Sequence, residues 1–174
     1  MTDNLMYRAF KTRLGWIACL ASPAGLVRVT LPCESRETAV LELGKGADSA
    51  WSPEAFASVE AELVKYCEGH RPDFSAVALD LSGGTPFRRQ VWSAIRSIPY
   101  GETRSYGWIA QKAGKPAAAR AAGQVVGDNP FAIIVPCHRV IASDGTLCGF
   151  GGGLDMKRKL LELEGVALQA NSVR

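Results

Sequence analysis

The stretch Ser105–Val126, SYGWIAQKAGKPAAARAAGQVV, decides how the second half of the chain folds. It predicts a short helix over 106–112 with Ser105 as its N-cap, a turn over 113–116, and a second helix over 117–126. Two short helices joined by a glycine-containing turn are typical of a helix-turn-helix. Short helix pairs also pack in protein cores, so the pattern leaves core packing open as an alternative to DNA binding.

The predicted second helix is built largely from small residues, among them Ala119, Ala121 and Gly123, and Arg120 is its only charged residue. A face of small residues lets the helix backbone come close to another surface. This favours a contact surface on the helix, without identifying what it contacts.

A further helix is predicted just before this pair, with Thr85 as its N-cap and Pro86 at its start. One side of this helix is apolar: Phe87, Val91, Ile95 and Ile98. The preceding Ser82-Gly83-Gly84 has the composition of a linker between two domains. We therefore expect two domains, over 1–82 and 83–174.

The first half mixes strand-like and helical segments and predicts a small α/β sheet domain. Runs of β-formers predict strands over 5–11, 15–21, 26–31 and 74–81. A helix is predicted over 36–43, and a second one with Ser52 as its N-cap and Pro53 at its first position.

Charge is divided unevenly within a net charge of +3. Residues 1–82 carry 8 Lys and Arg against 11 Asp and Glu, whereas residues 83–174 carry 12 against 6. The second half therefore has the electrostatics to approach phosphates. Taken by itself, the charge favours an ordinary solubilising surface over a phosphate-binding one.

Cysteine usage and the hydropathy of the chain indicate the cellular compartment in which the protein is expected. The five cysteines are odd in number and form no CxxC pair, which predicts reduced thiols in a cytosolic setting. The start of the chain has no secretory pattern, and no apolar run reaches the length of a membrane span. Cys67 and His70 could supply two metal ligands, but a helix end with an incidental histidine explains them better, so no metal site is expected.

Cys137 is the candidate nucleophile. The apolar run 131–135 predicts a buried strand that delivers Cys137 immediately after Pro136, whose ring fixes the backbone. A thiol with an ordinary pKa of about 8.5 is mostly protonated at neutral pH and needs a base. His138 could be that base, with Glu164 orienting its imidazole. The alternative is an inert core cysteine beside an incidental histidine.

The stretch Ile134–Ile141, IVPCHRVI, resembles the signature of the O6-alkylguanine-DNA alkyltransferases, also called methylated-DNA–protein-cysteine methyltransferases. The resemblance runs from Thr85 to Gly165, whereas the first half matches only in general character and position. The other matching motifs are Pro99–Tyr106 (PYGETRSY), Ala119–Gly123 (ARAAG), Asp128–Pro130 (DNP), Gly151–Leu154 (GGGL) and Lys157–Gly165 (KRKLLELEG). A set this long, in order and at the family's spacing, is highly specific.

The resemblance implies an α/β first domain and a mainly α second domain with a winged helix-turn-helix. Cys137 would be the alkyl acceptor, attacking the O6-alkyl carbon in one displacement that leaves a thioether. His138 and Glu164 would form the activating relay through a water. Tyr106 would donate a hydrogen bond to the purine as guanine leaves, and Asn129 would hold the turn before the active-site strand.

The resemblance also implies a substrate pocket and a structural arginine. Val140, Phe150 and Gly151 fall where the family binds the alkylated base, although many members carry Tyr and Ser in place of Phe150 and Gly151. The missing side chain of Gly151 would alter the tolerance for bulkier alkyl groups. Arg139 would tie down the local backbone.

The O6 atom of guanine cannot be reached inside a duplex, so the base must flip out. Arg120 resembles the family's arginine finger, which fills the vacated place in the stack while its helix lies in the minor groove without reading sequence. The other expected DNA contacts are Ser105, Ala119, Ala121 and Gly123. The alternative for Arg120 is a phosphate contact or a surface ion pair.

The implied function is direct-reversal repair of double-stranded DNA containing O6-alkylguanine, with each molecule acting once and O4-alkylthymine left open as a second substrate. No cofactor, metal or membrane is expected. We expect a monomer in the cytoplasm at the nucleoid, or in the nucleus of a eukaryote, and leave cooperative binding on DNA open.

Three alternatives were weighed against this function. The runner-up is a non-enzymatic binder of alkylated DNA that recruits other repair, but the related alkyltransferase-like proteins replace the cysteine that is present here. An alkylation-sensing transcription regulator would need a longer chain. An unrelated Cys-His hydrolase would be expected to carry a nucleophile-elbow motif, and it would turn over.

Overall fold

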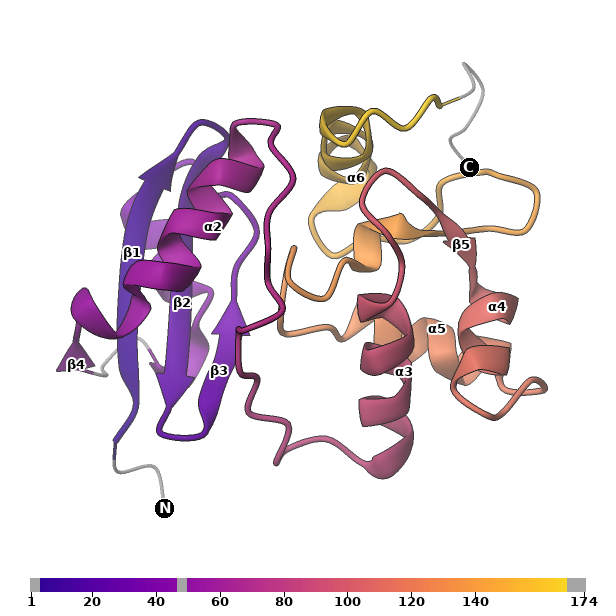
Figure 1. Cartoon of the computed structure of the whole chain (residues 1–174), viewed down its shortest axis with the longest axis horizontal. Coiled ribbons are helices and arrows are strands. Elements are labelled where there is room, and N and C mark those ends of the chain that lie inside the picture. The colour runs from indigo at the N-terminus through magenta and orange to yellow at the C-terminus, as the bar shows by residue number, and fades with distance from the viewer. Residues whose placement is uncertain (1–3, 47–49, 169–174) are drawn as a thin grey trace. The chain divides into compact units, whose positions relative to one another are not determined.

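The structure is a computed structural model, and it describes residues 4–46 and 50–168. The chain forms two compact units (Figure 1). The first contains Met1–Gly83 and Pro130–Ile134, and the second contains Gly84–Asn129 and Val135–Arg174.

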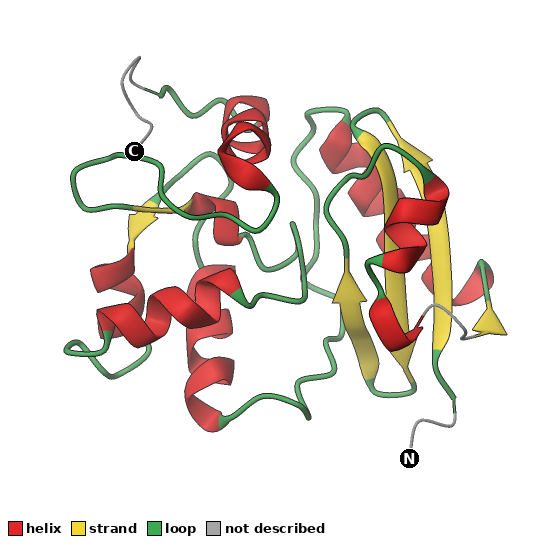
Figure 2. Ribbon diagram, turned by 180° about the vertical axis from the view of Figure 1, so that it is seen from behind, coloured by secondary structure: helices red, strands yellow, loops and turns green. Residues whose placement is uncertain are grey.

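A small mixed sheet with the strand order β3-β2-β1-β4 organises the first unit (Figures 1 and 2). Its strands are β1 (Met6–Thr12), β2 (Gly15–Ser22), β3 (Gly25–Val29) and β4 (Ala50–Trp51). The pairs β1–β2 and β2–β3 are antiparallel, and β1–β4 is parallel. The helices are α1 (Arg36–Leu41) and α2 (Ala57–Cys67), with the 3₁₀ turns η1 (Gly44–Gly46) and η2 (Glu54–Phe56).

Side chains that alternate along the strands make the core of this unit. Ala9, Ala18 and Leu20 of β1 and β2 are buried in one cluster with Ala39 of α1 and Leu43. Because successive strand residues point to opposite faces, Phe10 and Ile17 are buried on the other face. The sheet is therefore covered on both faces, and Figure 1 shows α2 lying across one of them.

The predicted strands over 5–11, 15–21 and 26–31 are confirmed, but the strand over 74–81 is wrong. Only Leu79 bridges to the sheet, at Leu26, with hydrogen bonds from Leu26 N to Ala78 O (2.9 Å) and from Asp80 N to Leu26 O (2.7 Å). Next to this bridge, the Asp80 carboxylate accepts from Ser22 Oγ at 2.6 Å.

The predicted helix N-cap at Ser52 is also wrong. The backbone N–H of Ser52 donates to Tyr7 O at 3.1 Å and so extends the sheet pairing. The helix starts later, with the η2 turn followed by α2.

The second unit is mainly helical. It contains α3 (Pro86–Arg96), α4 (Tyr106–Lys112), α5 (Ala119–Gly127) and α6 (Gly153–Leu163), with the 3₁₀ turn η3 (Cys137–Arg139). The short strands β5 (Arg104–Ser105) and β6 (Val140–Ile141) pair in parallel. The small mixed sheet with its helices in the first unit and the mainly helical second unit confirm the predicted fold class, an α/β domain followed by a mainly α domain.

The helix starts in this unit follow the predicted capping residues. Thr85 Oγ1 accepts from Arg88 N at the start of α3, and Ser105 Oγ accepts from Trp108 N at the start of α4. The helix predicted over 117–126 begins two residues later, at Ala119.

The buried strand predicted over 131–135 is wrong, although all these residues are buried. Phe131 forms a single bridge to Val29, with Val29 N donating to Pro130 O and Ala132 N to Val29 O. The chain then turns, and Ile133 takes a positive φ of 69°. Apolar content predicts burial correctly here but cannot distinguish a strand from a buried turn.

Candidate active site

Cys137 opens the η3 turn of the second unit and is only 7% exposed. Its backbone N–H donates to Val135 O at 2.8 Å, which fixes the turn. Asn129 Nδ2 donates to Val135 O at 2.7 Å and to Cys137 Sγ at 3.2 Å. One amide therefore holds both the backbone before the cysteine and the sulfur itself.

The surroundings of Cys137 act on its pKa in opposite directions. Burial raises the pKa of the thiol, while the hydrogen bond from Asn129 and the charge of Lys157 lower it, and burial prevails. The resting sulfur is therefore a protonated thiol at neutral pH, and a nucleophilic thiolate requires a neighbouring base.

His138, Glu164 and Arg139 form a buried hydrogen-bonded chain beside this thiol. His138 Nε2 lies 2.6 Å from Glu164 Oε1, and neither side chain is exposed. Arg139 donates to both carboxylate oxygens, at 2.8 and 3.0 Å, and to Ile98 O at 2.8 Å. Glu164 itself is the C-cap of α6.

Gly101 completes the carboxylate site. Its N–H donates to Glu164 Oε2 at 3.1 Å. Its φ is +78°, and a Cβ at this position would lie 3.0 Å from Glu164 O. A glycine is therefore required where this loop meets the end of α6.

Burial and the neighbouring charges set the protonation states of Glu164 and His138 in this hydrogen-bonded group. Burial alone would raise the pKa of Glu164, but hydrogen bonds and charge from His138 and Arg139 lower it to about 2. Burial lowers the pKa of His138 in spite of the opposing effect of Glu164. The carboxylate contact holds the N–H on Nε2, so that Nδ1 carries the lone pair that can accept a proton.

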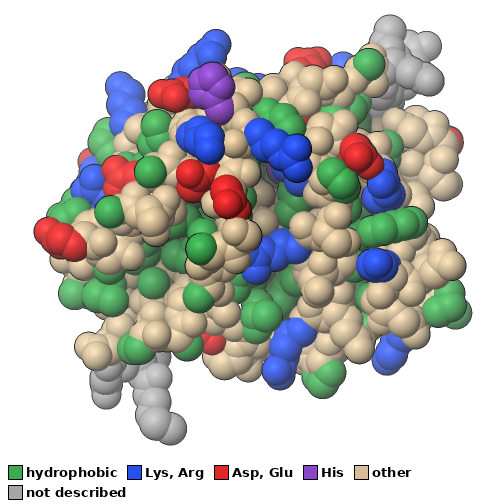
Figure 3. Space-filling view, in the orientation of Figure 1, with side chains coloured by type: hydrophobic (Ala, Val, Ile, Leu, Met, Phe, Trp, Pro, Cys, Tyr) green, Lys and Arg blue, Asp and Glu red, His purple; other side chains and the backbone are tan. Residues whose placement is uncertain are grey.

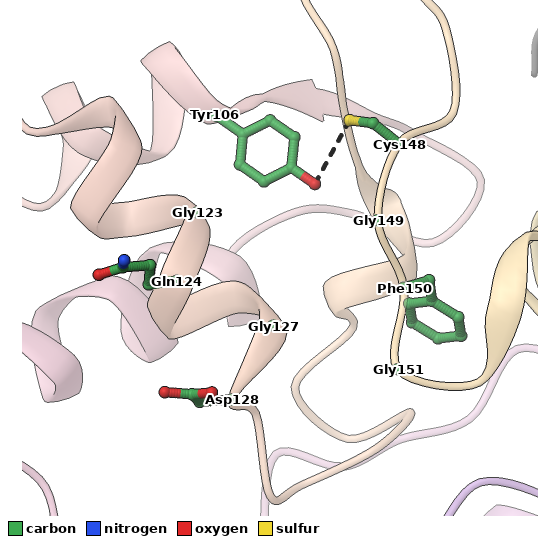
Figure 4. A pocket seen from close by; sticks show the side chains of 9 residues that line it. All are labelled: Tyr106, Gly123, Gln124, Gly127, Asp128, Cys148, Gly149, Phe150 and Gly151. Carbon is green, nitrogen blue, oxygen red and sulfur yellow. Dashed lines mark hydrogen bonds between the residues drawn. The ribbon is translucent and has the colours of Figure 1, made fainter. Parts of the chain in front are cut away.

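A pocket of about 690 Å³ lies in the same unit (Figure 4). The predicted catalytic residue Tyr106 and the predicted substrate residues Phe150 and Gly151 line it, whereas Val140, the third predicted substrate residue, is fully buried outside the lining. Its other lining residues are Gly123, Gln124, Gly127, Asp128, Cys148 and Gly149.

The hydroxyl of Tyr106 points toward Cys148 in this pocket, and Cys148 Sγ donates to Tyr106 Oη at 3.6 Å (Figure 4). Burial, together with Cys148 and Cys137, raises the pKa of Tyr106. The phenol therefore stays protonated and can donate a hydrogen bond to a molecule in the pocket.

The residues predicted to contact DNA lie on α5 and at the start of α4. Arg120 and Ala121 are exposed, and Ala119 and Gly123 are half-buried. The Gly123 side of α5 faces Tyr106, since a Cβ there would lie 3.5 Å from the ring. On the face drawn in Figure 3, Lys and Arg side chains are spread over the second unit, in line with its excess of positive charge.

Sequence reasoning did not single out two residues of this region, Cys148 and Lys157, although Lys157 is 0% exposed. A signal for Lys157 exists in its spacing, because Leu160, Leu161 and Glu164 follow it on the buried side of α6.

Within residues 4–46 and 50–168, no three His, Cys, Asp or Glu side chains gather in a way that could hold a metal ion. No helix in the same part of the chain has the length and apolar character to cross a membrane.

The fold and the site together define a class. A buried cysteine lies beside a histidine that is paired with a carboxylate, in a helical unit with an open pocket and a net positive charge. This is the arrangement of proteins that use a cysteine as a nucleophile.

Comparison with known proteins identifies the family. The profile of the 6-O-methylguanine DNA methyltransferase DNA-binding domain matches residues 86–166. The methylated-DNA–protein-cysteine methyltransferase of Methanosarcina acetivorans is 38% identical over 163 residues, covering 92% of this chain and 99% of that protein. Its counterpart in Mycolicibacterium paratuberculosis is 54% identical over 113 residues, covering 65% and 67%.

Solved structures agree with this assignment. The crystal structure of Mycobacterium tuberculosis OGT in complex with DNA matches with a TM-score of 0.76 and 43% identity, covering 91% of this chain and 92% of that one. The chain belongs to the O6-methylguanine-DNA methyltransferase family, and the resemblance of its sequence to this family is confirmed.

Proposed function

We propose that this protein repairs alkylated double-stranded DNA by direct reversal, transferring an alkyl group from O6 of guanine to Cys137. The observation that carries the proposal is the buried contact of 2.6 Å between His138 and Glu164, since His138 directly follows the buried Cys137 in the chain. Membership of a family whose relatives are named methylated-DNA–protein-cysteine methyltransferases supports it.

The reaction follows from the charges of the site. The Cys137 proton passes to His138 Nδ1, directly or through a water, and the imidazolium that forms is stabilised by Glu164. The thiolate then attacks the alkyl carbon, so that the S–C bond forms as the C–O6 bond breaks. The leaving guanine takes up one proton from solvent, which balances the proton that Cys137 gave up through His138, and a hydrogen bond from Tyr106 limits the negative charge on its ring.

Each molecule acts once in this scheme, because a thioether is a poor leaving group. Asn129 would hold the sulfur and the preceding backbone, and Arg139 would keep Glu164 ionised. Phe150 and Gly151, which line the pocket, would contact the flipped base. O4-alkylthymine would be a second substrate only if this pocket also accepts a pyrimidine.

DNA binding is assigned to the second unit. Under this proposal α4 and α5 form a helix-turn-helix, with the β5–β6 pair and the loop after it as the wing. Arg120 is exposed in the first turn of α5, where it could enter a base stack. The neighbouring Ala119, Ala121 and Gly123, together with Ser105, would allow close approach to the minor groove. Residues 1–82 would serve as a scaffold.

The test is a duplex carrying one O6-methylguanine, incubated with the protein and followed by intact mass spectrometry. We expect one methyl group per molecule, mapped to Cys137 and absent from the Cys137→Ser variant. Damage-dependent DNA binding without any adduct would instead favour the non-enzymatic damage binder, and repeated turnover would favour a hydrolase.

A further inference from the structure

We propose that Cys148 is a positioning residue for the transfer reaction: its thiol holds the hydroxyl of Tyr106 so that the phenol proton is directed at the base in the pocket. This inference rests on the proposed function and adds a residue to it. The argument depends on how Tyr106 is held at its backbone, its ring and its hydroxyl.

The backbone and the ring of Tyr106 are held by two different helices. Tyr106 is the first residue of α4, directly after the N-cap Ser105, whose Oγ accepts from Trp108 N at 3.2 Å. Its ring lies against α5, since a Cβ added to Gly123 would be 3.5 Å from Tyr106 Cδ1. With the backbone and the ring fixed, the phenol hydrogen keeps one freedom, which is rotation about the bond between the ring and the oxygen.

The hydroxyl of Tyr106 meets the pocket loop at Cys148. Cys148 Sγ donates to Tyr106 Oη at 3.6 Å, and among the residues that the structure describes no other hydrogen bond reaches this oxygen. The loop is anchored next to the thiol, because Cys148 O accepts from Lys157 Nζ at 2.9 Å. Both Cys148 and Tyr106 line the pocket of about 690 Å³, and the dashed line in Figure 4 marks their contact.

The chemistry of the reaction decides which of the two groups donates. A phenol has one proton to give, and in the proposed reaction Tyr106 gives its hydrogen bond to the leaving purine. Tyr106 Oη can then only accept from the thiol of Cys148, whose S–H is a weak donor. A phenol hydrogen lies near the ring plane, on one side of the oxygen or the other. An S–H on one side therefore leaves the other side for the proton, and Cys148 orients it.

The thiol also strengthens the donor that it orients. In the reacting complex, S–H, O–H and purine would form a chain, and hydrogen bonds in a chain polarise one another. A side chain without a donor at position 148 would leave the hydroxyl in place but remove this partner. Loss of the thiol should therefore weaken the donation from Tyr106 without abolishing it, which is a smaller effect than loss of the hydroxyl itself.

The experiment measures the single-turnover rate of methyl transfer, by intact mass, with O6-methylguanine duplex at a saturating concentration. Four proteins are compared: the unaltered chain, Cys148→Ala, Tyr106→Phe and the variant with both changes. We expect Cys148→Ala to slow transfer by about threefold to tenfold, the effect of one net hydrogen bond. In the Tyr106→Phe background the same change should have no effect, because no hydroxyl remains to be positioned.

Two further variants complete the comparison. Cys148→Ser keeps a hydrogen-bond donor, so it should be slowed less than Cys148→Ala. Cys33→Ala is the matched control, because Cys33 is also half-buried but lies in the first unit, and it should leave the rate unchanged. If Cys148→Ala does not fold, Cys148→Val, which also lacks a donor, takes its place with the same expectations.

An equal slowing by Cys148→Ala in both backgrounds would overturn the inference, because the effect would not pass through the phenol. Faster transfer by Cys148→Ala would also overturn it, since the thiol would then compete with the base for the phenol proton. Weaker duplex binding with an unchanged rate at saturation would assign Cys148 to binding instead. The proposed function fails separately, if the unaltered protein forms no adduct with the duplex.

Discussion

His138 Nε2 and Glu164 Oε1 lie 2.6 Å apart in a site where neither side chain is exposed to solvent. The two residues are 26 positions apart in the chain, on the η3 turn and at the end of α6. Arg139 contacts the same carboxylate and stabilises its charge. The same carboxylate therefore supports both the stability of the second unit and the charge of the imidazole.

Glu164→Gln should impair both transfer and stability. The neutral amide cannot support an imidazolium, so we expect the transfer rate to fall by about 100-fold or more. It also leaves Arg139 buried without its counter-charge, which should cost about 3–5 kcal/mol in the free energy of unfolding. Single-turnover mass spectrometry and urea unfolding measure the two effects. Glu162→Gln, exposed on the same helix, is the control, and a Glu164→Gln protein as fast as the unaltered chain would rule out the relay.

Acid should remove the stability that Glu164 provides. Its pKa in the folded protein, about 2, lies below the ordinary carboxyl value of about 4.3, so the unfolded chain binds the proton first. The contribution is therefore complete above about pH 4.3 and is lost as the pH falls toward 2. Urea unfolding at a series of pH values should show the Glu164→Gln and unaltered proteins converging in this range. A difference between them that is independent of pH would contradict the ionised state of Glu164.

Tyr106→Phe should slow the transfer step by removing the hydrogen-bond donor to the leaving guanine. One donor of this kind is worth about 10²–10³ in rate in well-studied sites. Because the pKa of Tyr106 is raised, the unaltered protein should show no loss of rate from phenol ionisation up to about pH 10, the ordinary tyrosine value. Tyr7→Phe in the first unit serves as the control. Full activity of Tyr106→Phe would show that the guanine leaves without help from this side chain.

Arg120→Ala should reduce transfer from duplex DNA while sparing transfer from free O6-alkylguanine base. Flipping costs a few kcal/mol, so loss of a residue that fills the stack should slow the duplex reaction by at least about tenfold. Lys11→Ala in the first unit controls for the change in net charge. A phosphate contact would behave differently: the defect would disappear at low salt, and the salt dependence of DNA binding would become shallower.

Alkylation should destabilise the protein. Cys137 is 7% exposed, so an added methyl group must be accommodated among packed neighbours. Overpacking of this kind costs about 1–3 kcal/mol, which corresponds to a fall in Tm of a few degrees for a chain of this size. Thermal unfolding before and after reaction with the duplex measures it. An unchanged Tm would show that the site already has room for the alkyl group.

The sequence by itself determined the local structure wherever a residue acts through its own backbone or its near neighbours. Ser105 and Thr85 begin α4 and α3 because their hydroxyls accept from N–H groups three residues ahead, and such caps can be read from the chain. The stretch Ile134–Ile141 likewise indicated the family, because the spacing of its residues is itself the signature.

Only the tertiary structure decided which distant groups meet. The apolar run 131–135 is a buried turn rather than a strand, because Phe131 forms a single bridge to Val29, far away in the chain, and Ile133 then takes a positive φ. Lys157 occupies a buried position of α6 because the carbonyls of Val140 and Cys148 are brought to its ammonium. Hydrogen bonding across long chain separations depends on where the folded backbone places each polar group, and this is why local pattern could predict Cys137 and His138 but not the carbonyl partners of Lys157.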